Sequence, residues 1–149
     1  MSVFKAYDIR GLAGSQLDAD FARRLGSSLV THLDAKTVAV ARDIRESGPE
    51  LHAAFIEGLS GAGANVIDLG ITTTGVLYRA TVDLSIDAAV VITASHNPPE
   101  YNGFKICRGP LPMAGEELQE LKETFDSGDF NTGSGAVIEM KDFENKVID

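Results

Sequence analysis

A group of chemically capable side chains lies directly after a short apolar run. Residues 88–92 read AAVVI, and the polar stretch behind them ends at a lysine. That stretch carries a hydroxyl, an imidazole, two amides and an amine: Ser95, His96, Asn97, Asn102 and Lys105. A serine hydroxyl can carry a transferred group when a lysine or histidine beside it moves the proton. The pattern predicts group-transfer chemistry on Ser95, with Lys105 and His96 as acid–base candidates.

Arginines in two earlier segments point to phosphate as the transferred group. They lie in residues 7–11 (YDIRG) and 42–46 (RDIRE), and are Arg10, Arg42 and Arg45. In an open α/β sheet, ligands bind beyond the carboxyl ends of the strands, and we expect both segments and residues 93–102 to lie there. Guanidinium forks, amides and hydroxyls suit phosphate oxygens. We therefore expect Arg10, Arg45, Asn97 and Asn102 to bind phosphate or substrate.

Each of these side chains also has an ordinary structural interpretation. A serine after a strand often caps a turn, and a histidine such as His96 often only makes hydrogen bonds. His32 and His52 fall in predicted helices, and we expect both at the surface. Lys105 alternates with Phe104 and Ile106, so its side chain points to the opposite side of a strand, where it could simply be solvated. A serine hydrolase is a weak alternative, because the sequence has no G-x-S-x-G motif around a nucleophile.

The elements that must position these residues alternate between strand and helix patterns. β-branched or apolar runs predict strands at residues 3–6, 37–41, 65–69, 87–93 and 103–107. Apolar residues at three- and four-residue spacing predict helices at residues 18–33, 47–61, 74–82 and 115–125. Asp18 is the expected cap of the first helix, and Ser47 with Glu50 resembles a capping box.

This order predicts an α/β fold: a three-layer α/β/α sandwich with a mixed, mostly parallel sheet. The strand at residues 103–107 follows its predecessor too closely for a crossover helix, so we expect it to be antiparallel and at the sheet edge. Residues 128–136 are polar and rich in glycine, which is typical of a linker. We therefore predict one domain over residues 1–127, and over residues 128–149 a linker and the start of a truncated second domain.

Composition limits the class of protein further. The chain has 149 residues, a net charge of −9 and one cysteine. An acidic chain argues against nucleic-acid or anionic-membrane partners, although a few clustered cations can still hold a phosphorylated small molecule. We expect no signal peptide or membrane span, and a single cysteine fits a reducing compartment, so we expect the cytoplasm.

Three motifs together resemble those of the α-D-phosphohexomutase family. TASHNPPEYNGFK (residues 93–105) is similar to the family's phosphoserine loop, YDIRG to its first signature and RDIRESG (residues 42–48) to its second loop. The motifs occur in the family's order, and the resemblance covers the chain as the family's first domain. The YNGFK form is most similar to the phosphomannomutase/phosphoglucomutase members.

The resemblance implies a reaction and a role for each matching residue. A phosphoserine at Ser95 gives its phosphoryl group to a hexose phosphate, and a bisphosphorylated sugar turns over and returns its other phosphate. Lys105 would be the general acid/base, His96 would assist, and Tyr7 and Arg10 would bound the phosphoserine site. Mg²⁺ would touch a phosphoryl oxygen on Ser95.

The resemblance also implies that other domains contribute. The family's acidic metal loop and its sugar-recognition loops belong to later domains, so we expect Mg²⁺ to be bound mainly there, and the remaining mutase domains to be partners. We expect the isolated chain to have little or no mutase activity. The alternative is a catalytically silent phosphate-binding or regulatory module that keeps the fold.

Overall fold

The computed structural model describes residues 2–94 and 97–140 of the chain. Its strands are β1 (Ile9–Leu12), β2 (Thr37–Arg42), β3 (Asn65–Ile71), β4 (Ala88–Ile92), β5 (Tyr101–Arg108), β6 (Leu111–Pro112) and β7 (Val137–Glu139). Its helices are α1 (Ala19–Leu33), α2 (Gly48–Gly61), α3 (Thr74–Asp83) and α4 (Glu116–Ser127). The predicted alternation of helices and strands is therefore confirmed.

The strands form one mixed sheet. Its order is β1-β5-β4-β2-β3-β7, with β6 paired to β5. β2 pairs in parallel with both β3 and β4, whereas β5 pairs antiparallel with β4 and β1. Among the described strands, β5 thus runs against all the others. The predicted antiparallel direction of β5 is confirmed, but the predicted edge position is wrong, because β1 covers its outer side.

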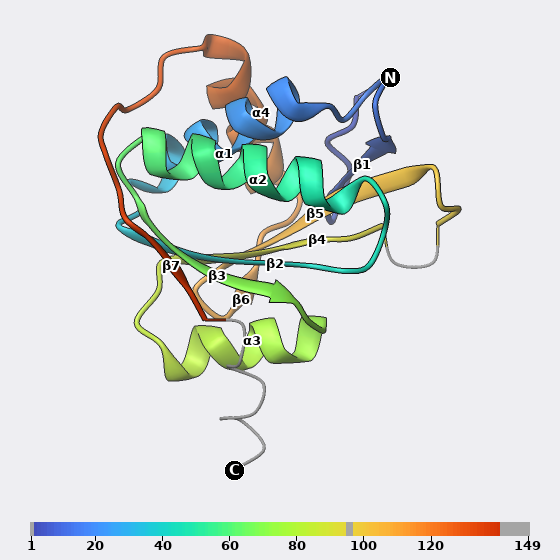
Figure 1. Ribbon diagram of the computed structural model, residues 1–149. Coiled ribbons are helices and arrows are strands. Elements are labelled where there is room, and N and C mark those ends of the chain that lie inside the picture. Colours follow the sequence, from blue (N-terminus) through green and yellow to red (C-terminus); the bar gives the residue numbers. More distant parts are fainter. Residues whose placement is uncertain (1, 95–96, 141–149) are drawn as a thin grey trace.

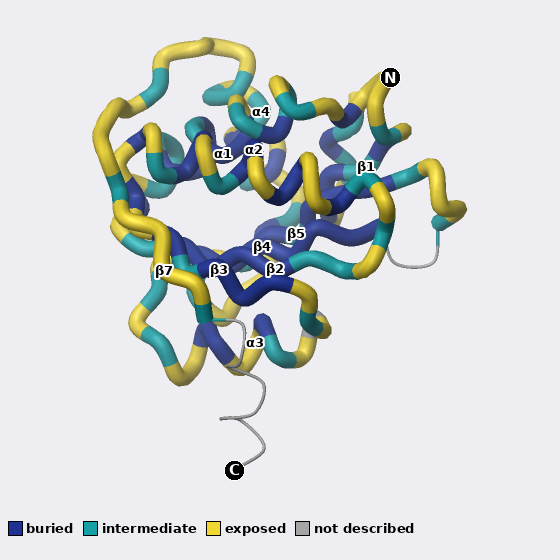
Figure 2. Tube along the Cα trace, viewed as in Figure 1, coloured by how far each residue is buried: buried dark blue, intermediate teal, exposed yellow. Residues whose placement is uncertain are grey.

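The helices cover the two faces of the sheet unequally: Figure 1 shows α1, α2 and α4 above the sheet and α3 below it. The upper layer and the sheet share a large apolar core that includes Leu25, Phe55 and Phe104. A smaller cluster joins α3 to the lower face through Leu77 and Val91. The three-layer α/β/α prediction is confirmed. The central strands β2 and β4 are buried from both sides (Figure 2), whereas on the lower face of β5 Cys107 packs against the α3 cluster and Lys105 lines a hollow.

The two predicted helix starts differ in how they are capped. The Asp18 carboxylate accepts a hydrogen bond from the Phe21 amide at 2.8 Å, so the predicted cap of α1 is confirmed. Ser47 precedes α2, but its side chain makes no capping hydrogen bond. Its hydroxyl instead accepts a hydrogen bond from the Asn102 side chain at 2.7 Å. The capping box is therefore wrong, because a distant amide takes the oxygen that a cap would use.

The start of the chain also differs from the prediction. Residues 3–6 were expected to form a strand, but Phe4 makes only an isolated bridge to Ile9, and the strand is Ile9–Leu12. Arg10 and Gly11 are consequently part of β1 and pair with Gly103 and Asn102 of β5. The end of the YDIRG segment is therefore paired, as a neighbouring strand, with the end of the TASHNPPEYNGFK segment.

The glycine-rich segment at residues 128–136, which we call the strap, is fastened to the domain. The amides of Gly133 and Gly135 donate to the carbonyls of Gly61 and Ser60, each at 2.9 Å. Beyond the strap, β7 adds a short parallel strand beside β3. The predicted linker is therefore bound along the helical layer, while the boundary at residue 127 stays a prediction. Residues 141–149 lie outside the described residues.

His52 is buried between α2 and β3. Its Nε2 lies 2.8 Å from an oxygen of Asp68, which also accepts the Gly70 amide at 2.9 Å. Histidines on helices were expected at the surface, but His52 is buried. The expectation for His52 is wrong because the side chain lies on the face of α2 that packs on the sheet.

Candidate functional site

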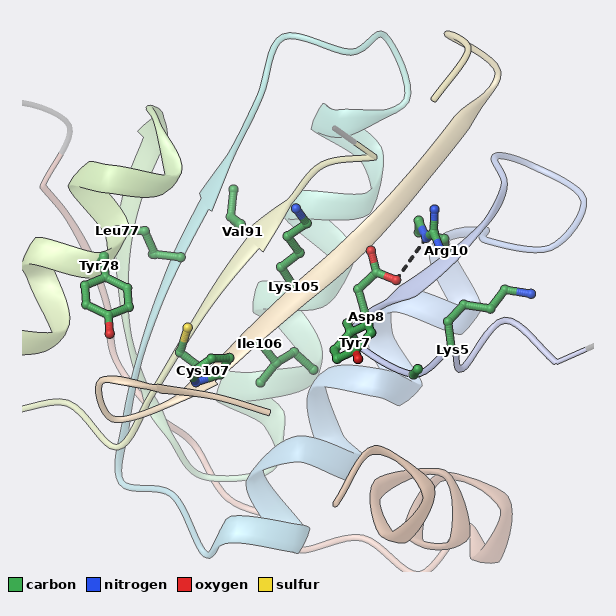
Figure 3. A pocket seen from close by; sticks show the side chains of 12 residues that line it. Lys5, Tyr7, Asp8, Arg10, Leu77, Tyr78, Val91, Lys105, Ile106 and Cys107 are labelled. Atoms are coloured by element: carbon green, nitrogen blue, oxygen red, sulfur yellow. Dashed lines mark hydrogen bonds and ion pairs between the residues drawn. The ribbon is translucent and has the colours of Figure 1, made fainter. Parts of the chain in front are cut away.

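A hollow of about 400 Å³ opens on the lower face of the sheet, between α3 and the segment at the start of β1. Figure 3 shows its lining, which includes Tyr7, Arg10, Leu77, Tyr78, Lys105 and Cys107. We call it the large hollow. Its floor is apolar, and its rim carries three cationic side chains, Lys5, Arg10 and Lys105, and one carboxylate, Asp8. Cations in excess at a concave surface attract anions, even on a chain with a net charge of −9.

A second hollow of about 240 Å³ shares Lys5 and Arg10 with the first. We call it the small hollow. Asn97 and Tyr101 line its other side, together with Gln16. The two hollows therefore bring together four of the residues singled out in the sequence: Tyr7, Arg10, Asn97 and Lys105. The shared cations, Lys5 and Arg10, lie where the two hollows meet.

Lys105 reaches the large hollow because of strand alternation. Its neighbours Phe104 and Ile106 are buried in the upper core, so Lys105 points to the lower face, as predicted. The residue pairs with Val91 of β4, whose side chain belongs to the cluster beneath the sheet. An amine placed at the rim of a concave, partly apolar site can move protons to or from a bound ligand.

Arg10 is held in place by an ion pair with Asp8. The guanidinium Nε lies 2.9 Å from a carboxylate oxygen, and the arginine side chain remains 42% exposed. A single pair leaves other N–H groups of the five in a guanidinium to face the hollows. Tyr7 lines the large hollow and is 82% exposed, so its phenol is accessible to solvent.

Ser95 and His96 lie outside the described residues, so their predicted roles stay predictions. The residues on either side are described and are bonded to each other. Asn97 donates to the carbonyl of Ala94 from its backbone amide at 3.1 Å and from its side chain at 2.8 Å. Ala94 and Asn97 are therefore close neighbours at the carboxyl end of β4, which is where the sequence led us to expect the site.

Two predicted phosphate or substrate ligands do not face either hollow as the described residues define them. Asn102 is fully buried, with its amide nitrogen bonded to Ser47 and its oxygen accepting the Gly103 amide at 2.9 Å. Arg45 donates to the backbone carbonyls of the segment that follows Asn97. Both side chains fasten the polar segment to the start of α2.

Lys5 and Gln16 line the small hollow, although the sequence analysis did not single them out. Lys5 stands two residues before Tyr7, and a basic residue beside YDIRG is the one signal that could have indicated it. Gln16 belongs to a turn, and its oxygen accepts the Leu12 amide at 2.7 Å. Nothing in the local sequence around Gln16 points to a site.

Cys107 forms part of the floor of the large hollow. Burial raises the pKa of its thiol above the ordinary value, because the thiolate loses contact with water. The neutral thiol therefore behaves as a small apolar side chain beside Leu77 and Tyr78.

The described residues do not offer a metal site of their own. No group of three or more histidine, cysteine, aspartate or glutamate side chains among them is arranged to hold a metal ion. Magnesium requires several oxygen ligands, so the described residues by themselves do not form a site for this ion. Within the same residues, no helix is both long and apolar enough to cross a bilayer.

Comparison with known families gives one match over most of the chain. The family model described as phosphoglucomutase/phosphomannomutase, alpha/beta/alpha domain I, matches residues 1–132. The chain is 43% identical over 139 residues to a Pseudomonas aeruginosa protein named phosphomannomutase/phosphoglucomutase, covering 91% of this chain and 30% of that protein. It is 46% identical over 133 residues to a Vibrio cholerae phosphomannomutase, covering 83% and 29% respectively.

Solved structures show the same relationship. The crystal structure of a phosphoglucomutase/phosphomannomutase family protein from Burkholderia thailandensis matches with a TM-score of 0.90 at 39% identity. The match covers 97% of this chain and 34% of that one. The chain thus spans about 30% of the length of the curated relatives it matches.

Proposed function

The chain belongs to the phosphoglucomutase/phosphomannomutase family as its α/β/α domain I, and we propose that it supplies the phosphoserine side of a hexose-phosphate mutase. The reaction interconverts hexose 6-phosphate and hexose 1-phosphate, which makes the full-length protein an isomerase. The remaining domains would supply the rest of the site, and the cytoplasm is the proposed compartment.

The observation that carries the proposal is the cationic rim shared by the two hollows. Lys5 and Arg10 line both cavities, Lys105 lines the large one and Asn97 the small one. Ser95 lies two residues before Asn97 in the sequence. A sugar phosphate needs cations and hydrogen-bond donors for its oxygens, and this rim offers both.

In the proposed reaction, a hydroxyl of the bound hexose phosphate attacks the phosphorus of phosphorylated Ser95. The new P–O bond to the sugar forms while the bond between phosphorus and Ser95 Oγ breaks. Lys105 accepts the proton from the attacking hydroxyl and passes it to Ser95 Oγ, so that the serine leaves as its hydroxyl, and His96 assists in positioning. The product is a bisphosphorylated hexose and a free serine.

The second half of the reaction reverses these roles. The bisphosphorylated sugar turns over, and Ser95 Oγ attacks the phosphate that the substrate carried originally. Lys105 takes the proton from the Ser95 hydroxyl and gives it to the departing sugar oxygen, so that protons and phosphoryl groups balance over the cycle. Tyr7 and Arg10 bound the phosphoserine site, and Asn97 contacts phosphate oxygens.

Magnesium is proposed as the cofactor; residues of a later domain would mainly hold it, together with a phosphoryl oxygen on Ser95. Mg²⁺ would supply charge neutralisation when bound. Because the chain spans only part of its relatives, the isolated 149-residue chain is expected to have little or no turnover. Robust conversion of mannose 6-phosphate or glucose 6-phosphate by the pure chain would contradict that part of the proposal.

Mass spectrometry of the full-length protein tests the carrier role. The peptide that contains Ser95 should carry the mass of one phosphoryl group, and it should gain heavy oxygen when the protein turns over a hexose monophosphate whose phosphate oxygens are isotopically labelled. Ser95→Ala should abolish both the adduct and turnover, while Ser85→Ala, at an exposed serine beyond α3, should leave both unchanged. Normal turnover by Ser95→Ala would overturn the proposed function. An adduct that takes up no label from any sugar phosphate would favour the silent phosphate-binding module.

A further inference from the structure

Arg45 donates hydrogen bonds to backbone carbonyls between Asn97 and Tyr101. Its Nη1 donates to the carbonyl of Pro98 at 2.7 Å and to that of Tyr101 at 3.1 Å. Its Nη2 donates to the carbonyl of Asn97 at 2.8 Å. One guanidinium therefore fastens three backbone carbonyls of a single turn.

Asp43, two residues before Arg45, binds the chain on the other side of Ser95, at Thr93. Thr93 donates its hydroxyl proton to Asp43 at 2.6 Å, and Asp43 accepts the backbone amide of Arg45 at 3.0 Å. The Nε of Arg45 lies 3.5 Å from the Asp43 carboxylate. Thr93 is two residues before Ser95 and Asn97 is two residues after it. The Asp43–Arg45 pair thus contacts the chain on both sides of Ser95 and His96.

These contacts leave Arg45 poorly suited to bind a substrate phosphate directly. A guanidinium has five N–H donors in a fixed plane, and three hydrogen bonds to carbonyls engage most of them. The side chain is 13% exposed and lines neither the large nor the small hollow as the described residues define them. Its chemistry is better explained by the backbone it binds than by a free anion.

We propose that Arg45 is a positioning residue that fixes the turn after Asn97, and with it the reach of the phosphoryl carrier, instead of a ligand of the sugar phosphate. The effect on turnover rests on the proposed function, whereas the clamp itself does not. A planar fork that binds three carbonyls cannot be replaced by lysine, which offers a single ammonium at one point. A site that only needs a positive charge near phosphate would tolerate lysine far better.

Hydrogen exchange of the 149-residue chain in phosphate-free buffer tests the clamp. The amides of Asn97 and Tyr101 are the reporters, since they donate to Ala94 and Pro98 at 3.1 and 3.0 Å. In Arg45→Lys and Arg45→Ala both amides should exchange about tenfold faster or more, because the lost hydrogen bonds to a charged group are strong ones. The amides of β4 should be unchanged. The matched control is Arg79→Lys, which alters an exposed ion pair with Asp83.

A measurement on the unmutated chain keeps the clamp testable even if both variants unfold. In phosphate-free buffer the Nη protons of Arg45 should give resolved NMR signals, because three carbonyls restrain rotation of the group. Averaged Nη signals in the unmutated chain, or unchanged exchange in Arg45→Ala, would overturn the clamp. Both readouts are independent of whether Ser95 accepts a phosphoryl group.

Kinetics of the full-length protein separate positioning from ligand binding. Arg45→Lys should lower kcat at least tenfold while KM for the hexose phosphate stays within about twofold, since a misplaced carrier slows transfer without removing a substrate contact. A raised KM with unchanged kcat would identify Arg45 as a phosphate ligand and overturn the inference. An unchanged kcat beside faster exchange would overturn the positioning role as well.

Discussion

The Asn102 side chain donates a hydrogen bond from Nδ2 to the hydroxyl of Ser47 at 2.7 Å. The contact joins the start of β5 to the residue before α2, across a large separation in sequence. Asn102 is fully buried, so water cannot replace Ser47 as its partner. Together with the Arg45 contacts, this bond joins the RDIRESG segment (residues 42–48) to the TASHNPPEYNGFK segment (residues 93–105).

Removing the Ser47 hydroxyl should therefore destabilise the chain. Ser47→Ala leaves a buried amide without an acceptor, which costs about 1–3 kcal/mol of unfolding free energy. Urea unfolding followed by circular dichroism measures the loss. Ser60→Ala, a partly exposed serine on the same helix, is the control and should stay within about 0.5 kcal/mol of the parent. A neutral Ser47→Ala would show that the amide finds another partner.

Two glycines should be required because other backbone atoms approach them closely. A methyl group at Gly103 would overlap the Ile9 carbonyl oxygen, and one at Gly135 would overlap that of Ala64. Gly103→Ala and Gly135→Ala should each lower stability by about 1–3 kcal/mol, since a strand or the strap must move away.

Gly61 provides the control for both glycine variants. Beyond its chain neighbours and the backbone of its own helix, an added methyl group there meets no described atom within 4 Å, and alanine favours helix over glycine. Gly61→Ala should be neutral or slightly stabilising in the same urea titration. Equal effects at Gly61 and Gly135 would mean that the strap is not held as closely as its hydrogen bonds indicate.

Lys105 should be needed for turnover but not for folding. Lys105→Met keeps the length of the side chain but removes the proton-transfer group, so kcat of the full-length protein should fall about 100-fold or more. The melting temperature should change little, because the amine lies at the rim of a hollow. Lys36→Met, at an exposed lysine paired with Asp34, should leave kcat unchanged. A similar loss in both variants would remove Lys105 from the mechanism.

Cys107 should make stability depend on pH in the alkaline range. Its pKa is raised in the folded chain, so between the unfolded and folded values the native state keeps a proton that the unfolded state has lost. The contribution of Cys107 to the free energy of unfolding should therefore be fully present below the pKa of the unfolded state. It should be lost as the pH rises through the pKa of the folded state.

Comparison with Cys107→Ala isolates that contribution from other groups that titrate at high pH. The difference in unfolding free energy between the two proteins should be constant at neutral pH. As the solution becomes alkaline, the unfolding free energy of the parent protein should fall relative to that of Cys107→Ala. A difference that stays flat through the alkaline range would mean that the thiol is as hydrated in the fold as in the unfolded chain.

The sequence by itself determined the order of the elements, the fold class and the family motifs. Strand and helix patterns are local, because each follows from which side chains recur at a spacing of two or near four residues. The apolar run of β4 and the alternation around Lys105 could be predicted in this way, and so could the cap at Asp18. The phosphate-site hypothesis rested on equally local features, namely residue types after strand ends.

Only the tertiary structure decided which polar side chains meet. Ser47 was expected to cap a helix and His52 to face solvent. Their actual partners are the Asn102 side chain and the Asp68 carboxylate. Each partner is distant in sequence, and buried donors and acceptors must be paired wherever the packed chain brings them together. Hydrogen-bond pairing across such distances depends on how the layers pack, which no local pattern specifies.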